Sequence, residues 1–285
     1  MKKYLNLGCG DRFHPAWTNI NFTSSGKDVI GFDLENGIPF PDDSYDVVYH
    51  SHLLEHFPKN KAEVFLRECK RVLVAGGIIR VVVPDLEAIT QAYLKALNLA
   101  AENSAEWAAN YDWLLLELYD QTVRNFSGGA MAQYLMQEKV VNEGYILARC
   151  GAEARKIRDM ADHIHRDSSD AGENQSGKSK HGYKSMLNKF KNLPSYLREK
   201  TIRYLLGVEY EALKIGRFRL SGEIHQWMYD RYSLKRILEK CGFVDVQQRT
   251  AIESYISGWP SFNLDTEVDG SVYKPDSLYM EAAKP

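Results

Sequence analysis

The sequence predicts an α/β protein in which a mostly parallel sheet is interrupted by a long helical segment. Three observations predict this class. Apolar, largely β-branched runs recur over the first 85 residues, apolar residues take helical spacing after Leu86, and the strand-like pattern returns after Ser221. Near-continuous apolar runs are typical of parallel strands that are buried on both faces. We therefore expect residues 1–85 and 222–285 to form one sheet, with a helical insertion at 86–221.

Seven short stretches are predicted as strands, five before the insertion and two after it. They are residues 4–7, 18–22, 28–33, 45–52, 78–84, 244–249 and 277–283. Only the fourth and fifth strands are separated by a clear helical pattern, for which Asn60 and Glu63 predict the N-terminal cap and Gly76-Gly77 the end. A closing amphipathic helix, "YSLKRILEKCGF", precedes the sixth strand. The sheet domain is therefore pared down near its N-terminus.

One segment of the insertion differs in composition from the rest. Residues 165–183 are small, polar and charged, and a lysine-rich tract follows them. Such a composition is typical of disordered segments, because it offers little apolar surface to bury. We expect this segment to be flexible.

The overall composition excludes several classes of protein. A net charge of −2 over 285 residues gives no reason to expect a nucleic-acid partner. No apolar run approaches the length of a membrane span, and the run before Cys9 is too short for a signal peptide. The four cysteines lie far apart, which favours a reducing compartment. We expect a cytoplasmic protein without a membrane span; the sequence does not predict its oligomeric state.

The first strand ends in a glycine turn, Gly8-Cys9-Gly10, and only seven residues separate this turn from Thr18. A helical crossover between parallel strands needs about a dozen residues or more, so no helix fits here. Polar residues also follow the third and fourth strands, at Asp33 and at residues 50–52. Ligands of open α/β sheets bind outside the carboxyl ends of the strands. We therefore expect these strand ends to meet at one crevice.

The motifs "LNLGCG", "FDLENGIPFPDDSYDVVYHSHLLEHF" and "ECKRVLVAGGIIRVVVPD" resemble, in order and spacing, those of class I S-adenosylmethionine-dependent methyltransferases of the small-molecule type. The closing helix and the last two strands are similar to the end of that family's fold. The stretch "LYDQTVRNFSGG" resembles bacterial members associated with surface-glycan pathways. The resemblance implies a Rossmann-like sheet, S-adenosyl-L-methionine as cofactor and S-adenosyl-L-homocysteine as product.

The resemblance also implies where the cofactor binds. The glycines would let the backbone approach the amino-acid and ribose parts of the cofactor, which has no pyrophosphate. Asn21 stands where the family usually has an acid that binds the ribose hydroxyls, and an amide can still donate and accept hydrogen bonds there without charge. Asn6 likewise replaces a common acid. The expected cofactor-binding residues are Asn6, Gly8, Cys9, Gly10, Asn21, Asp33, Leu34, His50 and Ser51.

Methyl transfer to a small acceptor follows as the expected activity, with oxygen favoured over nitrogen or carbon. The insertion would form a lid that sets specificity. His225, His56 and the neighbouring Glu55 are the candidates for removing a proton from the acceptor, since histidine titrates near neutral pH. An already acidic hydroxyl would need no protein base. The residues expected to contact the acceptor are Asp120, Gln121, Arg124, Trp227 and Tyr229.

Two other functions stay open. A non-catalytic cofactor-binding or scaffold protein of the same fold would also explain the motifs and is favoured by Asn21. A metal-dependent hydrolase is suggested by "HSHLLEH", but this stretch has one extra residue and places Glu55 where that motif has Asp. Residues 265–276 imitate a calcium loop, although Pro275 and a short terminal Asp favour a turn between strands. We therefore expect no metal ligands.

Overall fold

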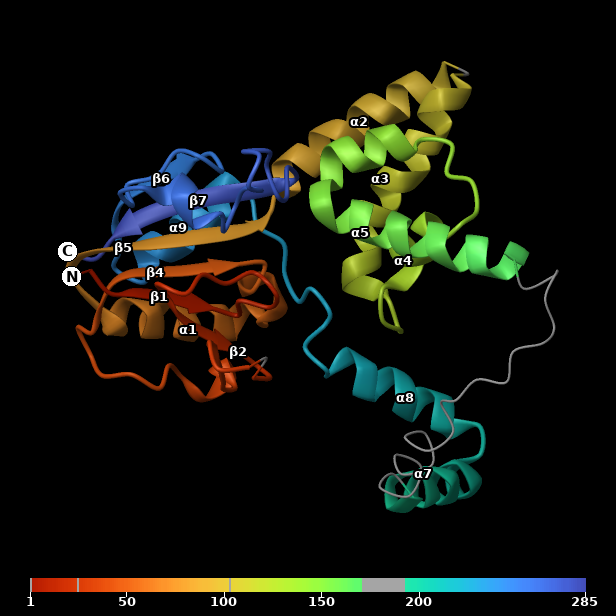
Figure 1. Ribbon diagram of the computed structural model, residues 1–285, viewed down its shortest axis with the longest axis horizontal. Coiled ribbons are helices and arrows are strands. Elements are labelled where there is room, and N and C mark those ends of the chain that lie inside the picture. Colours follow the sequence, from red (N-terminus) through yellow and green to blue (C-terminus); the bar gives the residue numbers. More distant parts are fainter. Residues whose placement is uncertain (1, 25, 103, 171–192) are drawn as a thin grey trace.

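The structure is a computed structural model that describes residues 2–24, 26–102, 104–170 and 193–285. Within these residues, seven strands form a single sheet in the order β3-β2-β1-β4-β5-β7-β6 (Figure 1). The strands are β1 (Tyr4–Leu7), β2 (Thr18–Asn21), β3 (Val29–Gly31), β4 (Tyr45–Ser51), β5 (Leu73–Pro84), β6 (Val244–Arg249) and β7 (Ser277–Ala283). The first five are parallel, and β7 runs antiparallel to both β5 and β6. The predicted α/β class is confirmed.

The link between β1 and β2 contains no helix, as the spacing predicts. Both strands have four residues, so the chain has to return over only about 13 Å at ~3.3 Å per residue. Side chains hold this short return in place. The buried Asn6 donates from Nδ2 to the backbone oxygen of Arg12 (3.1 Å) and to Oδ1 of Asn19 (3.2 Å). Hydrogen bonds of side-chain amides therefore hold the link between β1 and β2, which has no crossover helix.

We expect Asn6→Asp to lower the free energy of unfolding by about 1–3 kcal/mol, because a carboxylate cannot donate to the Arg12 oxygen. The measurement is urea unfolding followed by circular dichroism. Asn36→Asp is the matched control, since Asn36 is exposed and should change stability by no more than ~0.5 kcal/mol. Equal stability of the two variants would show that the Asn6 amide does not hold the turn.

Helices cover one face of the sheet and a long loop covers the other. Helices α1 (Lys59–Val72) and α9 (Arg231–Lys240) contribute to the main core, which includes buried residues of β1, β4 and β5. On the opposite face, the loop between β6 and β7 packs instead, with the short 3₁₀ helix η3 (Trp259–Phe262). The ring of Trp17 lies 6.0 Å from that of Trp259. The loop thus fills the face that the missing crossover helix leaves uncovered.

A buried ion network fastens this loop to the sheet. Arg80 of β5 is fully buried and donates to the carboxylates of Asp265 (2.8 Å) and Glu281 (2.7 Å). It also donates to the backbone oxygens of Thr250 (2.7 Å) and Glu253 (3.1 Å). Asp265 thus pairs with Arg80, and an antiparallel bridge joins Thr266 to Val272, as the expected turn requires.

The expected boundaries of α1 are wrong at both ends. The helix begins directly after Pro58, at Lys59, and Asn60 makes no capping hydrogen bond. Proline is favoured at helix starts because its φ is already fixed near the helical value. The helix ends at Val72, since β5 starts at the next residue and runs through Gly76-Gly77.

The insertion is helical and has a core of its own. Its helices are α2 (Leu86–Ala101), α3 (Ala105–Val123), α4 (Gly129–Leu135), α5 (Glu143–Asp170), α7 (Leu193–Leu206) and α8 (Glu209–Arg219). Figure 1 shows α2 to α5 grouped beside the sheet and α7 and α8 standing apart from them. Of the segment expected to be flexible, residues 165–170 belong to α5, and residues 171–183 lie outside the described part of the chain.

Helix α5 is broken where it meets the β6–β7 loop. Gly151 has φ 63° and ψ −135°, and a side chain there would collide with the backbone oxygen of Tyr273. The amide of Ala152 donates to that same oxygen (3.1 Å). This close approach places the second half of α5 against the loop and over the carboxyl ends of β1 and β4.

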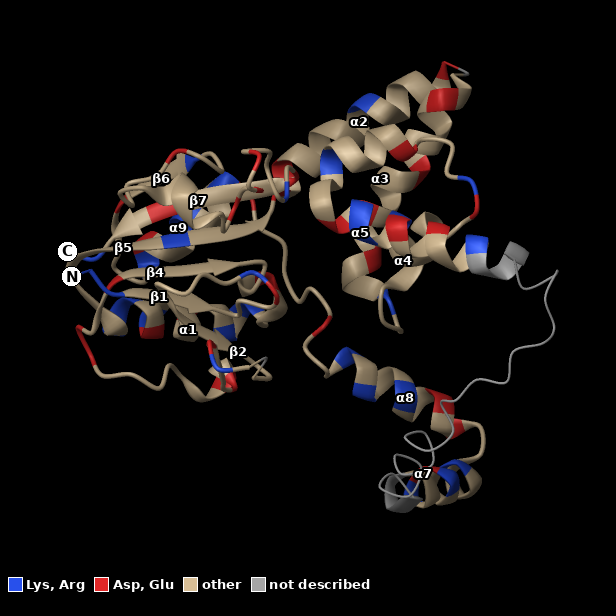
Figure 2. Cartoon of the chain, in the orientation of Figure 1, with Lys and Arg blue, Asp and Glu red and all other residues tan. Residues whose placement is uncertain are grey.

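Charged residues of both signs are interspersed over the sheet and the helices (Figure 2). Across the described ranges, no helix combines the length and the apolar character needed to cross a membrane. All four cysteines are free thiols.

Candidate functional site

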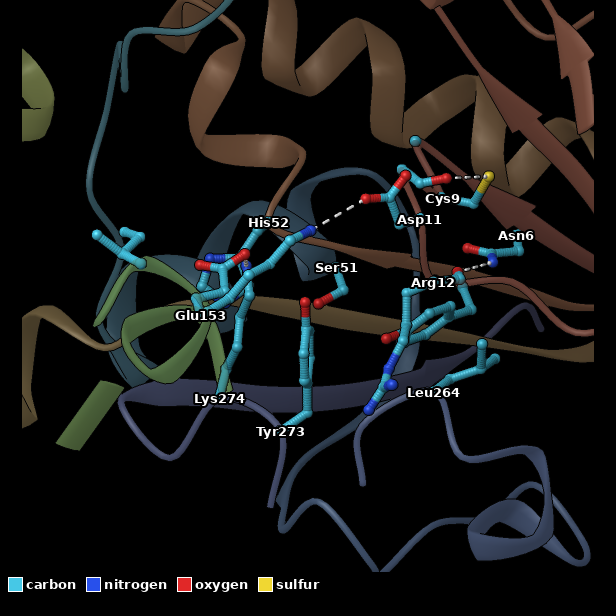
Figure 3. Close-up of a pocket in the computed structure, with 15 residues that line it drawn as sticks. Asn6, Cys9, Asp11, Arg12, Ser51, His52, Glu153, Leu264, Tyr273 and Lys274 are labelled. Carbon is cyan, nitrogen blue, oxygen red and sulfur yellow. Dashed lines mark hydrogen bonds and ion pairs between the residues drawn. The ribbon is translucent and has the colours of Figure 1, made fainter. Parts of the chain in front are cut away.

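A cavity of ≈ 400 Å³ lies at the carboxyl ends of β1 and β4 (Figure 3). The sheet, helix α5 and the β6–β7 loop all contribute side chains to it. The residues that line it are Asn6, Gly8, Cys9, Gly10, Asp11, Arg12, Tyr49, Ser51, His52, Glu153, Lys156, Ile157, Leu264, Tyr273 and Lys274. The glycine turn therefore forms one wall, and the insertion and the loop close over it.

The two glycines of the turn have different surroundings. Both have positive φ, 66° at Gly8 and 52° at Gly10. A Cβ on Gly8 would lie 2.8 Å from the side chain of Leu53, so packing alone excludes a larger residue. No heavy atom lies within 4 Å of the position that a Cβ on Gly10 would take. Gly10 therefore leaves open space in the cavity wall, which a ligand can fill by close approach to the backbone.

The charged side chains around the cavity occur in pairs of opposite sign. Lys274 lies 2.9 Å from Glu153, and Lys156 lies 3.5 Å from Asp11. The second pair joins α5 to the glycine turn, and both of its side chains are exposed. A lining with both signs of charge suits a zwitterionic ligand better than a simple anion.

Cys9 also lines the cavity, but its chemistry is that of a buried thiol. Burial raises the pKa of the Cys9 thiol to about 11. The thiol is therefore protonated at neutral pH and is a weak nucleophile.

Four residues expected to bind the cofactor stand outside this lining. Asn21 ends β2, and the exposed Asp33 caps a short 3₁₀ helix, η1 (Leu34–Asn36). Both lie at the same edge of the parallel sheet as the glycine turn. Leu34 packs against the main core. His50 is fully buried, and burial lowers its pKa to about 4.

His52 lines the cavity, as expected for the end of the fourth strand, although the cofactor-binding residues named from the sequence stopped at Ser51. Its φ of 49° is uncommon for a residue other than glycine. Nε2 lies 2.8 Å from the hydroxyl of Ser277, and Nδ1 lies 3.3 Å from the Glu55 carboxylate. The stretch "HSHLLEH" indicates that histidines follow the strand. Its spacing does not show which histidine adopts the left-handed conformation.

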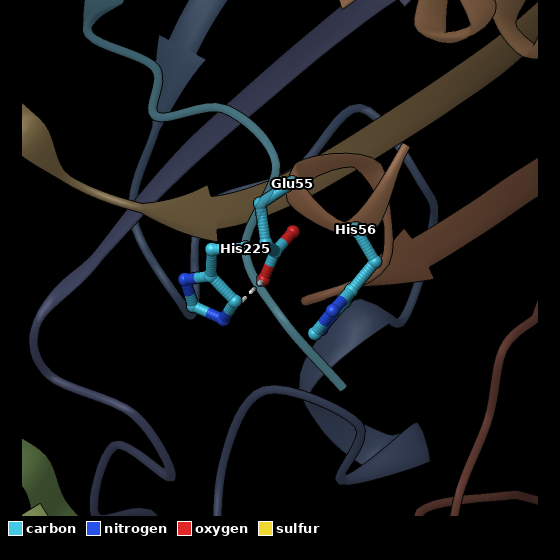
Figure 4. Close-up of side chains that lie close together, drawn as sticks. All are labelled: Glu55, His56 and His225. Atoms are coloured by element: carbon cyan, nitrogen blue, oxygen red, sulfur yellow. Dashed lines mark ion pairs between the residues drawn. The ribbon is translucent and has the colours of Figure 1, made fainter. Parts of the chain in front are cut away.

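The three expected acid–base residues, Glu55, His56 and His225, lie together (Figure 4). Glu55 and His56 belong to the 3₁₀ helix η2 (Leu54–His56), directly after β4, and His225 comes from the segment that follows α8. Nε2 of His225 is 4.0 Å from the Glu55 carboxylate, and the two histidine rings are 4.8 Å apart. None of the three lines the cavity, since His52 stands between it and Glu55.

Burial decides the charges in this cluster. It lowers the pKa of His225 to about 3 and also lowers the pKa of His56, so both rings are neutral at pH 7. Burial opposes the charge of Glu55, but the contact with His52 and the nearby histidines lower its pKa to about 2. The cluster at neutral pH is one carboxylate among neutral imidazoles.

Two of the residues expected to contact the acceptor hold the insertion together. The carboxylate of Asp120 accepts from the amides of Ala130 (2.7 Å) and Met131 (3.3 Å), and so caps the start of α4. Arg124 does not pair with Asp120, four residues before it, but donates to the backbone oxygen of Glu223 (3.2 Å).

Trp227 and Tyr229 lie on the segment that returns from the insertion to the sheet, and Gln121 of α3 contacts this segment. The backbone oxygen of Gln121 accepts from the amide of His225 (3.0 Å). Trp227 and Tyr229 line a second cavity of ≈ 700 Å³ near α1 and α9, where Lys59 Nζ lies 4.2 Å from the Trp227 ring centre. None of these five residues is part of the lining of the cavity beside Gly10.

Comparison with known proteins adds a family match. Residues 16–81 match the family model described as a methyltransferase domain. The match begins after the glycine turn, so the role of that turn rests on its geometry. Residues 16–81 are thus similar to a methyltransferase domain, and the seven-stranded sheet that contains them is Rossmann-like.

Several solved structures are similar to the chain. A SAM-dependent methyltransferase from Archaeoglobus fulgidus is 13% identical, with 99% of this chain and 86% of that chain covered and a TM-score of 0.38. The YcgJ protein from Bacillus subtilis is 20% identical over 34% and 51%, with a TM-score of 0.25. The [4+2]-cyclase SpnF is 21% identical over 29% and 38%, with a TM-score of 0.24.

The matched part of the chain thus spans only 38% and 51% of the lengths of SpnF and YcgJ. At such identities and TM-scores these likenesses carry no argument about activity. No curated protein matches the chain.

Proposed function

We propose that this protein transfers the methyl group of S-adenosylmethionine to an oxygen atom of a small acceptor, a glycan or another small metabolite. The observation that carries the proposal is the open space beside Gly10, in a cavity at the carboxyl ends of β1 and β4. This is where open α/β sheets bind their ligands. The matched methyltransferase domain supports the choice of cofactor.

The residues around the cavity fit this cofactor. Gly10 permits close approach of the backbone, and the lining offers both signs of charge to a zwitterionic amino-acid group. Ser51 adds a hydroxyl. Asn21 and Asp33, at the adjoining strand ends, are the polar groups available to the rest of the cofactor.

When bound, the cofactor supplies a methyl group that its sulfonium makes reactive. The chain itself binds, orients and excludes water, which can lower a barrier by several kcal/mol through positioning alone. Helix α5 and the loop around Tyr273 would exclude water from the cavity. The exposed Lys156–Asp11 pair across it is worth ~0–1 kcal/mol, so parting it to admit an acceptor costs little.

The test has two measurements on the wild-type protein. Calorimetry should show binding of S-adenosylmethionine and S-adenosylhomocysteine, and a panel of glycans, phenols and hydroxy acids should contain an acceptor that releases S-adenosylhomocysteine. No heat with either ligand, on folded protein, would refute the proposal. Binding without turnover across the whole panel would favour the non-catalytic alternative.

A further inference from the structure

The buried carboxylate of Glu55 lacks the partners that such a group normally has. The side chain is fully buried, and neither oxygen has a hydrogen-bond partner among the described residues. Within that same part of the chain, its ion pairs are with His52 (3.3 Å) and His225 (4.0 Å), and with no lysine or arginine. A buried carboxylate is costly unless it is paired or coordinates a metal. The described partners of this carboxylate are therefore histidines alone.

Two imidazoles stand beside this carboxylate in a form that can bind a metal. One potential ligand atom each from Glu55, His56 and His225 lie within 4.8 Å of one another. Nδ1 of His56 lies 3.2 Å from the backbone oxygen of Ile224. Metal-binding histidines almost always donate their other nitrogen to such an acceptor, which fixes the tautomer. Nε2 of His56 is thereby left with its lone pair free.

Backbone hydrogen bonds hold the Glu55 segment beside the His225 segment. The amides of Gln226 (2.7 Å) and Trp227 (3.2 Å) both donate to the backbone oxygen of Glu55. The amide of His225 donates to Gln121 of α3. Residues that are 170 positions apart in the sequence, Glu55 and His225, are therefore fixed together by main-chain bonds and not only by side chains.

We propose that Glu55, His56 and His225 bind a zinc ion. Two imidazoles and a carboxylate are a ligand set that suits this metal. Ligand bonds of ~2.0–2.2 Å at tetrahedral angles place the ligand atoms about 3.4 Å apart, so the side chains close by roughly 1 Å on binding. The ion compensates the buried charge and ties the end of β4 to the segment that returns from the insertion.

A second cluster, Glu117, Cys150 and Asp276, is a weaker candidate. Glu117 already accepts two hydrogen bonds from Arg149, at 2.9 and 3.3 Å. Burial raises the pKa of all three groups, which favours their protonated forms, and metals bind the deprotonated ones. This cluster serves as the control.

The proposal replaces the sequence-based expectation of no metal ligands. That expectation rested on the spacing within "HSHLLEH" and on the imitation of a calcium loop at residues 265–276. The first histidine of "HSHLLEH", His50, is buried in the core. The third ligand comes from His225, which no local motif could include.

The test uses untagged protein, because a histidine tag would itself bind zinc. After treatment with a chelator and dialysis against zinc, metal per chain is measured by mass spectrometry and thermal unfolding is followed with and without zinc. We expect one zinc per chain in the wild type and in Glu117→Gln, with a raised unfolding midpoint. Glu55→Gln and His225→Gln should each lose the stoichiometric metal and the shift in midpoint.

Circular dichroism verifies that each variant is folded, and the wild-type metal content can overturn the proposal even where a variant does not fold. Wild-type protein without stoichiometric zinc would overturn the proposal. So would loss of zinc in Glu117→Gln with retention in Glu55→Gln, which would move the site to the second cluster. Neither readout depends on methyl transfer, so failure here and failure of the proposed activity are distinguishable.

Discussion

Gly10→Val should weaken the binding of S-adenosylhomocysteine by ~100-fold or more while the sheet stays folded. The Cβ of the new side chain would project into open space, with no heavy atom beyond the adjoining residues within 4 Å, so we expect it to compete with a ligand and not with the protein core. Loss of two or three close backbone contacts is worth about 1–1.5 kcal/mol each, and 1.4 kcal/mol is a factor of ten. Calorimetry gives the affinity, and circular dichroism reports the fold.

The left-handed backbone at Gly10 requires a matched control, since a β-branched residue there adds strain of ~1–3 kcal/mol. Gly207, between α7 and α8, has the same φ of 52° and the same empty surroundings. Gly207→Val carries the same strain far from the cavity and should bind as the wild type does. If both variants bind normally, the cofactor does not approach Gly10, and the proposed site is wrong.

The fold was predictable because its signals are local. Each strand is a short apolar run, and strands that follow one another in the sequence pair in the sheet, except β3 and β4, which β2 and β1 separate, and β5 and β6, which β7 separates. The absence of a helix after Gly10 followed from chain length alone. The cover on the second face was not predictable, because the loop at 250–276 has no periodicity and is held by Arg80, whose partners lie 170 or more residues away.

The residues of the site were predictable where they lie at the end of a strand. They were not predictable where segments far apart in the sequence come together. The glycine turn and Ser51 line the cavity, as the strand ends suggested. Lys156 and Lys274 were missed because they reach it from α5 and from the β6–β7 loop. Asp120 was expected to contact the acceptor, yet its carboxylate caps the start of the next helix. Such tertiary contacts cannot be predicted from the spacing of residues in the sequence.

The largest loss of stability is expected where charge is most deeply buried. Arg80 has all of its guanidinium nitrogens engaged, with Asp265 and Glu281 as charged partners and two backbone oxygens of the β6–β7 loop as neutral ones. Both carboxylates are buried as well, and Asp265 also accepts from the hydroxyl of Tyr49 (2.6 Å). Replacing such a whole network by apolar residues changes stability little. Removing only one partner costs much more, because the remaining charges stay buried without a counter-ion.

Arg80→Met should therefore lower the free energy of unfolding by about 3–5 kcal/mol, because it leaves the buried carboxylate of Asp265 without a cation and that of Glu281 with only the more distant Arg249 (3.7 Å). Urea unfolding gives the value. Arg67→Met, which breaks a solvent-screened surface pair with Glu63, is the control and should change the free energy of unfolding little. Adding Asp265→Asn and Glu281→Gln to Arg80→Met should restore part of the lost stability, because the two buried carboxylates are then replaced by neutral amides. A loss in Arg80→Met no larger than in Arg67→Met would mean that the loop is held by its aromatic packing and not by the buried charges.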